Sequence, residues 1–204
     1  MIKTIIFDNN GVLTTSCEEG AVEGLIDYLG VSKERFFPVW NREAEAVDEG
    51  KIKTEKFLQN VVNELNPGKD LEVCQRYYWH SYEPKLEVRE FAKSLKKKFE
   101  IAFLTNFGDH FWTFDKRWKL EQLFDKDKMF VSADLKMVKP HPDIYYAVLA
   151  RLGRKPEEVV FIDDKKDNID TALKVGMYAI QFKSLKQVEK DLENILEHQP
   201  SMSS

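Results

Sequence analysis

The sequence contains little cysteine: Cys17 and Cys74 are the only two among 204 residues. Neither belongs to a CxxC pair or to a cysteine and histidine spacing typical of zinc sites, which argues against a disulfide scaffold and a zinc site. Long hydrophobic runs are also missing. The apolar start reaches acidic and polar residues by Asp8, so it is too short for a signal-peptide core or a membrane span. We therefore expect a cytoplasmic protein with reduced thiols and no membrane partner.

The chain has no strong excess of charge of either sign, because 31 lysines and arginines face 35 aspartates and glutamates. A formal net charge of -4 gives no general attraction to nucleic acid or to anionic lipid. Hydrophobic residues make up 43% of the chain, which indicates a folded rather than a disordered protein. At this length we expect one core with at most a modest insertion, as a monomer or a weak homodimer.

Short apolar runs recur along the chain, and most of them end at a polar residue. They cover residues 2–7, 99–106, 129–132, 158–164 and 177–182. Helical patterns at residues 88–98, 143–152 and 168–174 separate them, and each is long enough for a crossover between parallel strands. This alternation predicts an α/β fold with a doubly wound parallel sheet. Ligands of such sheets bind at the carboxyl ends of the strands, which here carry Asp8, Thr105, Asn106, Asp163 and Asp164.

One long stretch after the first strand interrupts the alternation. It has helical patterns at residues 21–29, 33–49, 54–65 and 71–81 and no convincing strand. We therefore expect an α/β core formed by residues 1–15 and 85–204 and an inserted helical cap formed by residues 16–84. The cap would select the substrate, and its candidate lining residues are Cys17, Glu18, Trp40, Asn41, Arg42 and Glu45. Bundle packing is the favoured role of Trp40, and solvent exposure that of Arg42. Residues 199–204 are expected to fray.

Four motifs resemble those of the haloacid dehalogenase (HAD) superfamily. Phe7-Asp8-Asn9-Asn10-Gly11-Val12 resembles the first motif, whose usual form is Asp-x-Asp-Gly-Val/Thr after a buried strand. Leu104-Thr105-Asn106, Val138-Lys139-Pro140 and Phe161-Ile162-Asp163-Asp164 resemble the second, third and fourth. They occur in family order at family-like spacing, and the helical insertion is similar to a C1-type cap. In the residues in and around these motifs, the chain is similar to glucose-1-phosphate phosphatase-like members and to the amino-terminal phosphatase domain of epoxide hydrolase.

The resemblance implies magnesium-dependent hydrolysis of a small phosphorylated metabolite, for instance a sugar phosphate. Asp8 would be the nucleophile, since a carboxylate can form an aspartyl-phosphate and split hydrolysis into two displacements. Lys139 would supply a positive charge between Asp8 and the phosphate, which Thr105 and Asn106 would bind through hydroxyl and amide groups at the head of a following helix. The predicted magnesium ligands are Asp8, Asn10, Asp163 and Asp164, because a hard cation relieves crowding among carboxylates. The structural alternatives are a turn-capping aspartate, a solvated acidic loop and an ordinary helix N-cap.

Asn10 departs from the family pattern, in which a second aspartate protonates the leaving oxygen and later activates water. The side-chain amide of Asn10 cannot exchange that proton, although the main-chain carbonyl of Asn10 can still bind a metal. General acid–base catalysis contributes about 10²- to 10⁴-fold. The chain is then a phosphatase for good leaving groups, or one that borrows its base from the substrate or the cap. Alternatively it is an impaired or engineered Asp-to-Asn phosphometabolite-binding protein, or a 2-haloacid dehalogenase-like hydrolase.

Several residues near the motifs have two interpretations. Phe111, Trp112, Phe114 and Trp118 lie in one turn-rich segment, where core packing is favoured over a partner surface. Asn168 either orients the carboxylate loop or caps its helix. His110 and His141 are candidates for substrate contact, and Lys136 is expected at the surface.

Overall fold

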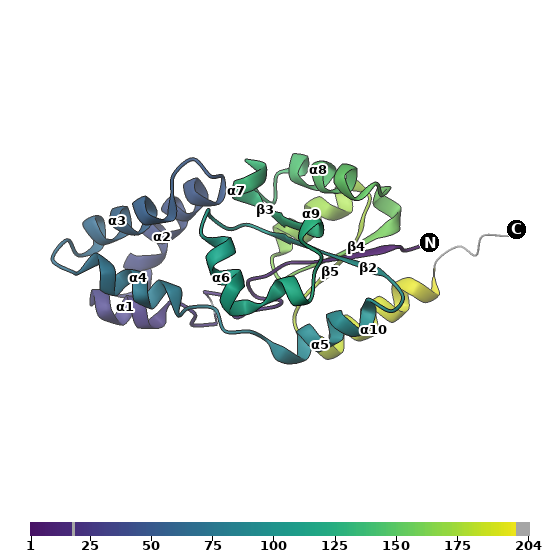
Figure 1. Cartoon of the computed structure of the whole chain (residues 1–204), viewed down its shortest axis with the longest axis horizontal. Coiled ribbons are helices and arrows are strands. Elements are labelled where there is room, and N and C mark those ends of the chain that lie inside the picture. The colour runs from purple at the N-terminus through teal and green to yellow at the C-terminus, as the bar shows by residue number, and fades with distance from the viewer. Residues whose placement is uncertain (18, 199–204) are drawn as a thin grey trace, which may run out of the picture.

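The structure is a computed structural model and describes residues 1–17 and 19–198 (Figure 1). Its sheet has five parallel strands in the order β3-β2-β1-β4-β5. The strands are β1 (Thr4–Phe7), β2 (Glu100–Thr105), β3 (Met129–Val131), β4 (Val159–Asp163) and β5 (Tyr178–Gln181). The predicted α/β fold with a doubly wound parallel sheet is confirmed, and so is the placement of residues 177–182 at a sheet edge.

Helices cover both faces of the sheet because successive strand residues point to opposite sides. Ile5 and Phe7 pack toward one face, which is covered by α5 (Leu86–Leu95), α6 (Phe111–Trp118) and α10 (Leu185–Glu197). Ile6 packs toward the other face, covered by α8 (Pro142–Leu152) and α9 (Lys166–Val175). The remaining short elements are α7 (Ser132–Leu135), η1 (Leu120–Gln122), η2 (Lys126–Lys128) and η3 (Pro156–Glu158). The core is therefore a three-layer sandwich.

Four helices form a separate group beyond the carboxyl ends of the strands (Figure 1). They are α1 (Glu23–Leu29), α2 (Lys33–Asp48), α3 (Thr54–Leu65) and α4 (Leu71–Trp79). Trp40 of α2 lies between aromatic rings of two neighbouring helices, with a centroid distance of 4.7 Å to Phe57 and 5.9 Å to Tyr78. The expectation that Trp40 packs within a small bundle is therefore confirmed, although the same ring also borders a cavity described below.

Two chain segments that run side by side connect this helical group to the sheet. Thr14 and Pro84 form an antiparallel bridge, the Thr15 N–H donates to the Glu83 carbonyl at 2.8 Å, and the Lys85 N–H donates to the Leu13 carbonyl at 2.9 Å. The division into a core of residues 1–15 and 85–204 and a cap of residues 16–84 stays a proposal, and this two-stranded crossing supports it.

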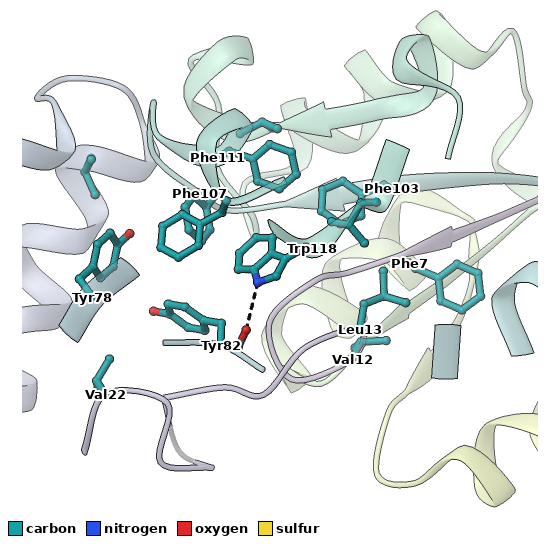
Figure 2. Close-up of a cluster of buried hydrophobic side chains, with 14 of the residues drawn as sticks. Phe7, Val12, Leu13, Val22, Tyr78, Tyr82, Phe103, Phe107, Phe111 and Trp118 are labelled. Carbon is teal, nitrogen blue, oxygen red and sulfur yellow. Dashed lines mark hydrogen bonds between the residues drawn. The ribbon is translucent and has the colours of Figure 1, made fainter. Parts of the chain in front are cut away.

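The segment expected to be turn-rich is in fact helix α6, so that expectation was wrong. Phe111, Phe114 and Trp118 recur at helical spacing and are at most 2% exposed, because they fill the core beneath the cap. Figure 2 shows Trp118 among Phe107, Phe111 and Tyr82, with its indole N–H donating to the Tyr82 carbonyl at 3.0 Å. Core packing is therefore confirmed for Phe111, Phe114 and Trp118, whereas Trp112 is only partly buried and its indole N–H donates to Asp134 Oδ2 at 3.1 Å.

Helix α10 was not predicted, although Val188 and Leu192 of that helix pack into the core. Across residues 1–17 and 19–198, no helix combines the length and apolarity needed to cross a membrane. The expectations for Glu18 and for residues 199–204 lie outside the described residues.

Candidate active site

Strand register brings the predicted site residues together. Phe7 at the end of β1 is paired with Phe103 of β2 and with Ile162 of β4, so Asp8 and Asp163 leave neighbouring strands at the same level. The chain after β1 leads to helices on one face of the sheet, whereas the chain after β4 leads to α9 on the other face. This divergence is the topological switch point at which open α/β sheets bind ligands.

Lys139 lies between the two carboxylates. Its Nζ donates to Asp8 Oδ1 at 2.7 Å, to Asp163 Oδ2 at 2.7 Å and to the Leu104 carbonyl at 3.0 Å. The side chain is 1% exposed, so its charge is opposed within the protein rather than by water. Lys136 is exposed as expected, but its Nζ also donates to the Gly50 carbonyl of the cap at 3.1 Å. The structure thus brings Lys139, and not Lys136, to the acidic cluster.

The Asn106 side chain fixes the main chain of Lys139. Its Nδ2 donates to the Lys139 carbonyl at 2.8 Å, and the Lys139 N–H donates to Asn106 Oδ1 at 2.8 Å. These two bonds engage the side-chain amide in holding the Lys139 loop; the expected phosphate contact through the Asn106 main-chain N–H stays a prediction. The helix that follows, α6, begins at Phe111 rather than at Asn106. Thr105 is 1% exposed and borders the cavity described below.

Asp163 is fully buried and held by several donors. Its Oδ1 accepts from the Lys165 N–H at 2.8 Å and from Asn168 Nδ2 at 2.9 Å, and its Oδ2 accepts from the same amide at 2.9 Å in addition to Lys139. Of the two interpretations of Asn168, orientation of the carboxylate loop is therefore the one that the structure shows. Each carboxylate oxygen already uses two acceptor positions.

Asp164 completes an acidic cluster. Asp8, Asp163 and Asp164 offer ligand oxygens that all lie within 4.8 Å of one another. Gly11 permits the close approach of Asp164: its φ is +90°, and a Cβ built on it would lie 2.3 Å from Asp164 Oδ2. A side chain at position 11 would therefore be strained and would displace the carboxylate. The glycine of the first motif shapes this cluster.

Asp8 and Asp163 share one buried lysine, and this contact shifts the proton affinities of Asp8 and Lys139. Burial raises the pKa of the Asp8 carboxyl to about 7, and Asp163 and Asp164 add to the rise while Lys139 opposes it. Burial by itself would lower the pKa of Lys139, but Asp163 and Asp8 raise it above its usual value. The cluster has more negative than positive charge, and a bound cation would relieve the excess.

Asn10 closes the turn that follows β1. Its Oδ1 accepts from Asn9 Nδ2 at 3.0 Å and from Thr14 Oγ1 at 3.2 Å. Asn10 also borders the cavity. A neutral amide at this place stabilises the loop but cannot exchange a proton with a ligand near neutral pH.

A cavity of about 340 Å³ lies between the sheet edge and the helical cap. Its core side includes Asp8, Asn10, Thr105, Asn106, Phe107, Lys139, Lys165 and Asn168. Its cap side includes Cys17, Phe37, Trp40, Asn41, Asp48, Phe57, Tyr78 and Tyr82. A pocket with charged groups at one end and aromatic groups at the other suits a ligand with an anionic head and an organic body.

Only some of the expected cap residues border this cavity. Cys17, Trp40 and Asn41 do. Among the described residues, Arg42 and Glu45 do not: both are exposed, and Arg42 pairs with Glu64 at 2.5 Å. His110 and His141 were candidates for substrate contact, but neither is part of the described lining. They lie at the N-caps of α6 and α8.

Asp48 is the functional candidate that sequence reasoning missed. It ends α2, is partly buried and borders the cavity. Burial raises the pKa of its carboxyl to about 7, although Lys165 and Lys139 oppose the shift. Helix α2 carries four acidic residues. The signal that could have pointed to Asp48 is its helical spacing, since it lies four residues after Ala44 and eight after Trp40, which border the same cavity.

Comparisons with known proteins agree with this geometry. Residues 2–176 match the family model described as haloacid dehalogenase-like hydrolase. The chain is 36% identical over 110 residues to rat bifunctional epoxide hydrolase 2, a match that spans 51% of this chain and only 20% of that protein. It is 22% identical over 195 residues to D-ribitol-5-phosphate phosphatase from Bacteroides thetaiotaomicron, spanning 89% and 92% of the two chains. A HAD family enzyme from the same organism, solved with magnesium and inorganic phosphate, aligns with a TM-score of 0.73 at 22% identity, covering 91% of this chain and 96% of that one.

Proposed function

The chain belongs to the haloacid dehalogenase-like hydrolase family, and we propose that it is a magnesium-dependent phosphatase of small phosphorylated metabolites that acts through Asp8. One observation carries the proposal: Asp8 is 6% exposed at the floor of the cavity, 2.7 Å from Lys139 and within an acidic cluster suited to a cation. The relative from Bacteroides thetaiotaomicron is named a phosphatase, and its match spans most of both chains, which supports this type of reaction.

The residues present fit a magnesium ion. Asp8, Asp164 and the main-chain carbonyl of Asn10 would hold it, in agreement with the preference of magnesium for oxygen ligands. Asp163 already accepts four hydrogen bonds, so its contribution would be mainly its charge. When bound, the ion would neutralise the carboxylates and the phosphate oxygens that approach them. Sugar phosphates are one class of substrate consistent with the cavity.

The residues of this chain supply a nucleophile and a binding site. One Asp8 carboxylate oxygen attacks phosphorus, and the bond from phosphorus to the substrate oxygen breaks. Water then attacks the aspartyl-phosphate, which releases inorganic phosphate and restores the carboxylate. The Thr105 hydroxyl and the Asn106 main-chain N–H would donate to phosphate oxygens, while Lys139 keeps Asp8 oriented. Closure of the cavity by the cap would keep bulk water from the reaction.

The test is hydrolysis of p-nitrophenyl phosphate and of a panel of sugar phosphates, with and without magnesium. We expect turnover with magnesium, its loss with a chelator, and its loss in Asp8→Asn. Asn168→Ala is expected to lower the rate less, since it removes only a positioning group. Release of halide from 2-haloacids without metal would instead show the dehalogenase alternative. Tight binding of sugar phosphates without turnover would show the binding-protein alternative. The cytoplasmic location and the monomer or weak homodimer remain predictions.

A further inference from the structure

We propose that Asp48, at the end of cap helix α2, is the general acid and base that Asn10 cannot be, and is therefore a catalytic residue of the phosphoryl transfer. The inference rests on the proposed function, because it assigns a proton donor to that same reaction. No motif of the sequence points to this residue, which lies 40 positions away from Asp8 and in a different part of the fold.

Asp48 lies on the side of the cavity where a leaving group must be. Asp8 enters the cavity from the sheet, whereas Asp48 enters it from the cap. In-line displacement places the leaving oxygen opposite the attacking carboxylate. The leaving oxygen of a bound phosphomonoester therefore faces the cap, and an acid on the cap side is suitably placed to protonate it.

The end of α2 is held against the core, so the position of Asp48 is defined. Ser132 Oγ, at the start of α7, donates to the Asp48 carbonyl at 2.6 Å. Beyond the α2–α3 turn, the Thr54 N–H and hydroxyl both donate to Asp109 Oδ1, at 2.9 and 2.8 Å. In Figure 1 the connection between α2 and α3 reaches toward α7 of the core. Asp48 thus belongs to the cap, but hydrogen bonds to the core fix the end of the helix that carries it.

Gly108 of the core permits this close docking. A Cβ on Gly108 would lie 2.7 Å from Val47 Cγ2 and 2.8 Å from Thr54 Oγ1, closer than atoms of a packed interior approach. Any side chain at position 108 would push the end of α2, and with it Asp48, away from the sheet. The loop that follows Thr105 and Asn106 therefore allows the end of α2 to come close enough to place Asp48 over the site.

The groups around Asp48 give it the proton affinity that the role requires. Lys165 and Lys139 face it from the core, Tyr78 faces it from the end of α4, and Tyr82 from the segment that follows α4. Burial raises the pKa of Asp48 to about 7 and the two lysines limit the rise. A catalytic acid works best when its pKa lies near the working pH, so this carboxyl can both give and accept a proton.

The proposed steps balance. As an Asp8 oxygen bonds to phosphorus and the phosphorus–oxygen bond to the substrate breaks, the Asp48 carboxyl gives its proton to the departing oxygen, which leaves as an alcohol. Water then enters from the same side. The Asp48 carboxylate takes a proton from that water as its oxygen bonds to phosphorus, Asp8 is released as a carboxylate, and Asp48 is protonated again for the next cycle.

The experiment compares leaving groups in Asp48→Asn and in a matched control, Glu45→Gln. Glu45 is an exposed acid on the same helix that does not border the described part of the cavity. A simple alkyl phosphate needs a proton on its leaving oxygen, whereas p-nitrophenolate leaves as a stable anion. We expect Asp48→Asn to lower kcat/KM for the alkyl phosphate by about 10²- to 10⁴-fold and for p-nitrophenyl phosphate by less than about 10-fold. Glu45→Gln should lower neither.

Rescue separates proton transfer from a structural role. Adding Asn10→Asp to Asp48→Asn supplies a carboxyl at the family position, so it should restore most of the activity on the alkyl phosphate. If Asp48→Asn does not fold, as judged by thermal unfolding, the same series is measured on Asp48→Ser. Equal losses for both substrates, or none, in a protein whose wild type is active would overturn the role of Asp48 alone. A wild type without phosphatase activity would overturn the proposed function and this inference together.

Discussion

Replacing Lys139 by methionine tests the electrostatic account of the site most directly. The change removes the buried cation between Asp8 and Asp163, both at 2.7 Å, while keeping a side chain of similar length. Breaking a buried ion pair by removing one partner costs about 3–5 kcal/mol, because the remaining charge stays buried and uncompensated. We therefore expect Lys139→Met to lower the free energy of unfolding by about that amount at pH 8.

The sign of the pH dependence follows from the remaining carboxylates. Without Lys139, the pKa of folded Asp8 rises further above its unfolded value, because the opposing effect of Lys139 is gone. A carboxyl with a raised folded pKa costs stability above its unfolded pKa, and the cost disappears as the pH falls and both states become protonated. The destabilisation should therefore be largest at pH 8 and shrink toward pH 5. Magnesium should recover part of it at pH 8 by taking the place of the missing charge.

Urea unfolding followed by circular dichroism measures these differences, with Lys136→Met as the matched control. Lys136 is exposed, and its Nζ donates to the Gly50 carbonyl, so its loss should cost less than about 1 kcal/mol at every pH. A Lys139→Met protein as stable as the Lys136→Met protein, or one whose loss of stability is the same at pH 5 and pH 8, would refute the reasoning.

Two further predictions concern stability and metal binding. Burial raises the pKa of the Asp48 carboxyl in the folded protein from 3.8 to about 7. Its charged form therefore costs stability above pH 7, and this cost is absent below pH 3.8. Thermal scans should show a higher melting temperature for Asp48→Asn than for wild type at pH 8, and equal melting temperatures at pH 3.5. Gly11→Ala should weaken magnesium binding in a calorimetric titration, because the new Cβ would meet Asp164 Oδ2 at 2.3 Å. Gly30→Ala, also at positive φ but with nothing described within 4 Å, should cost only backbone strain of about 1 kcal/mol and leave magnesium affinity unchanged.

Much of the fold could be predicted because its signals are local. The five strands were found as short apolar runs, and the structure places helix α3 at residues 54–65, the range that the pattern indicates. Helix α6 was missed because its aromatic residues, read without the helical period, suggested an irregular segment. Helix α10 was missed although its apolar positions recur at helical spacing. In both helices the local preference of the sequence agrees with the fold.

By itself, the sequence determined the five strands, several of the helices and the polar residues at the strand ends, because hydrophobic periodicity and turn residues act over a few neighbours. Because β1 and β4 pair in parallel, Asp8 and Asp163 lie at the same edge of the sheet. The tertiary structure alone decided that the Asn106 amide holds Lys139 and that Asp48 of α2 faces the cavity. The placement of Asp48 depends on how closely Gly108 and Ser132 allow the end of α2 to approach the core, and the role of Asn106 on contacts with a loop 33 residues away. Such long-range contacts are not encoded in a local sequence period.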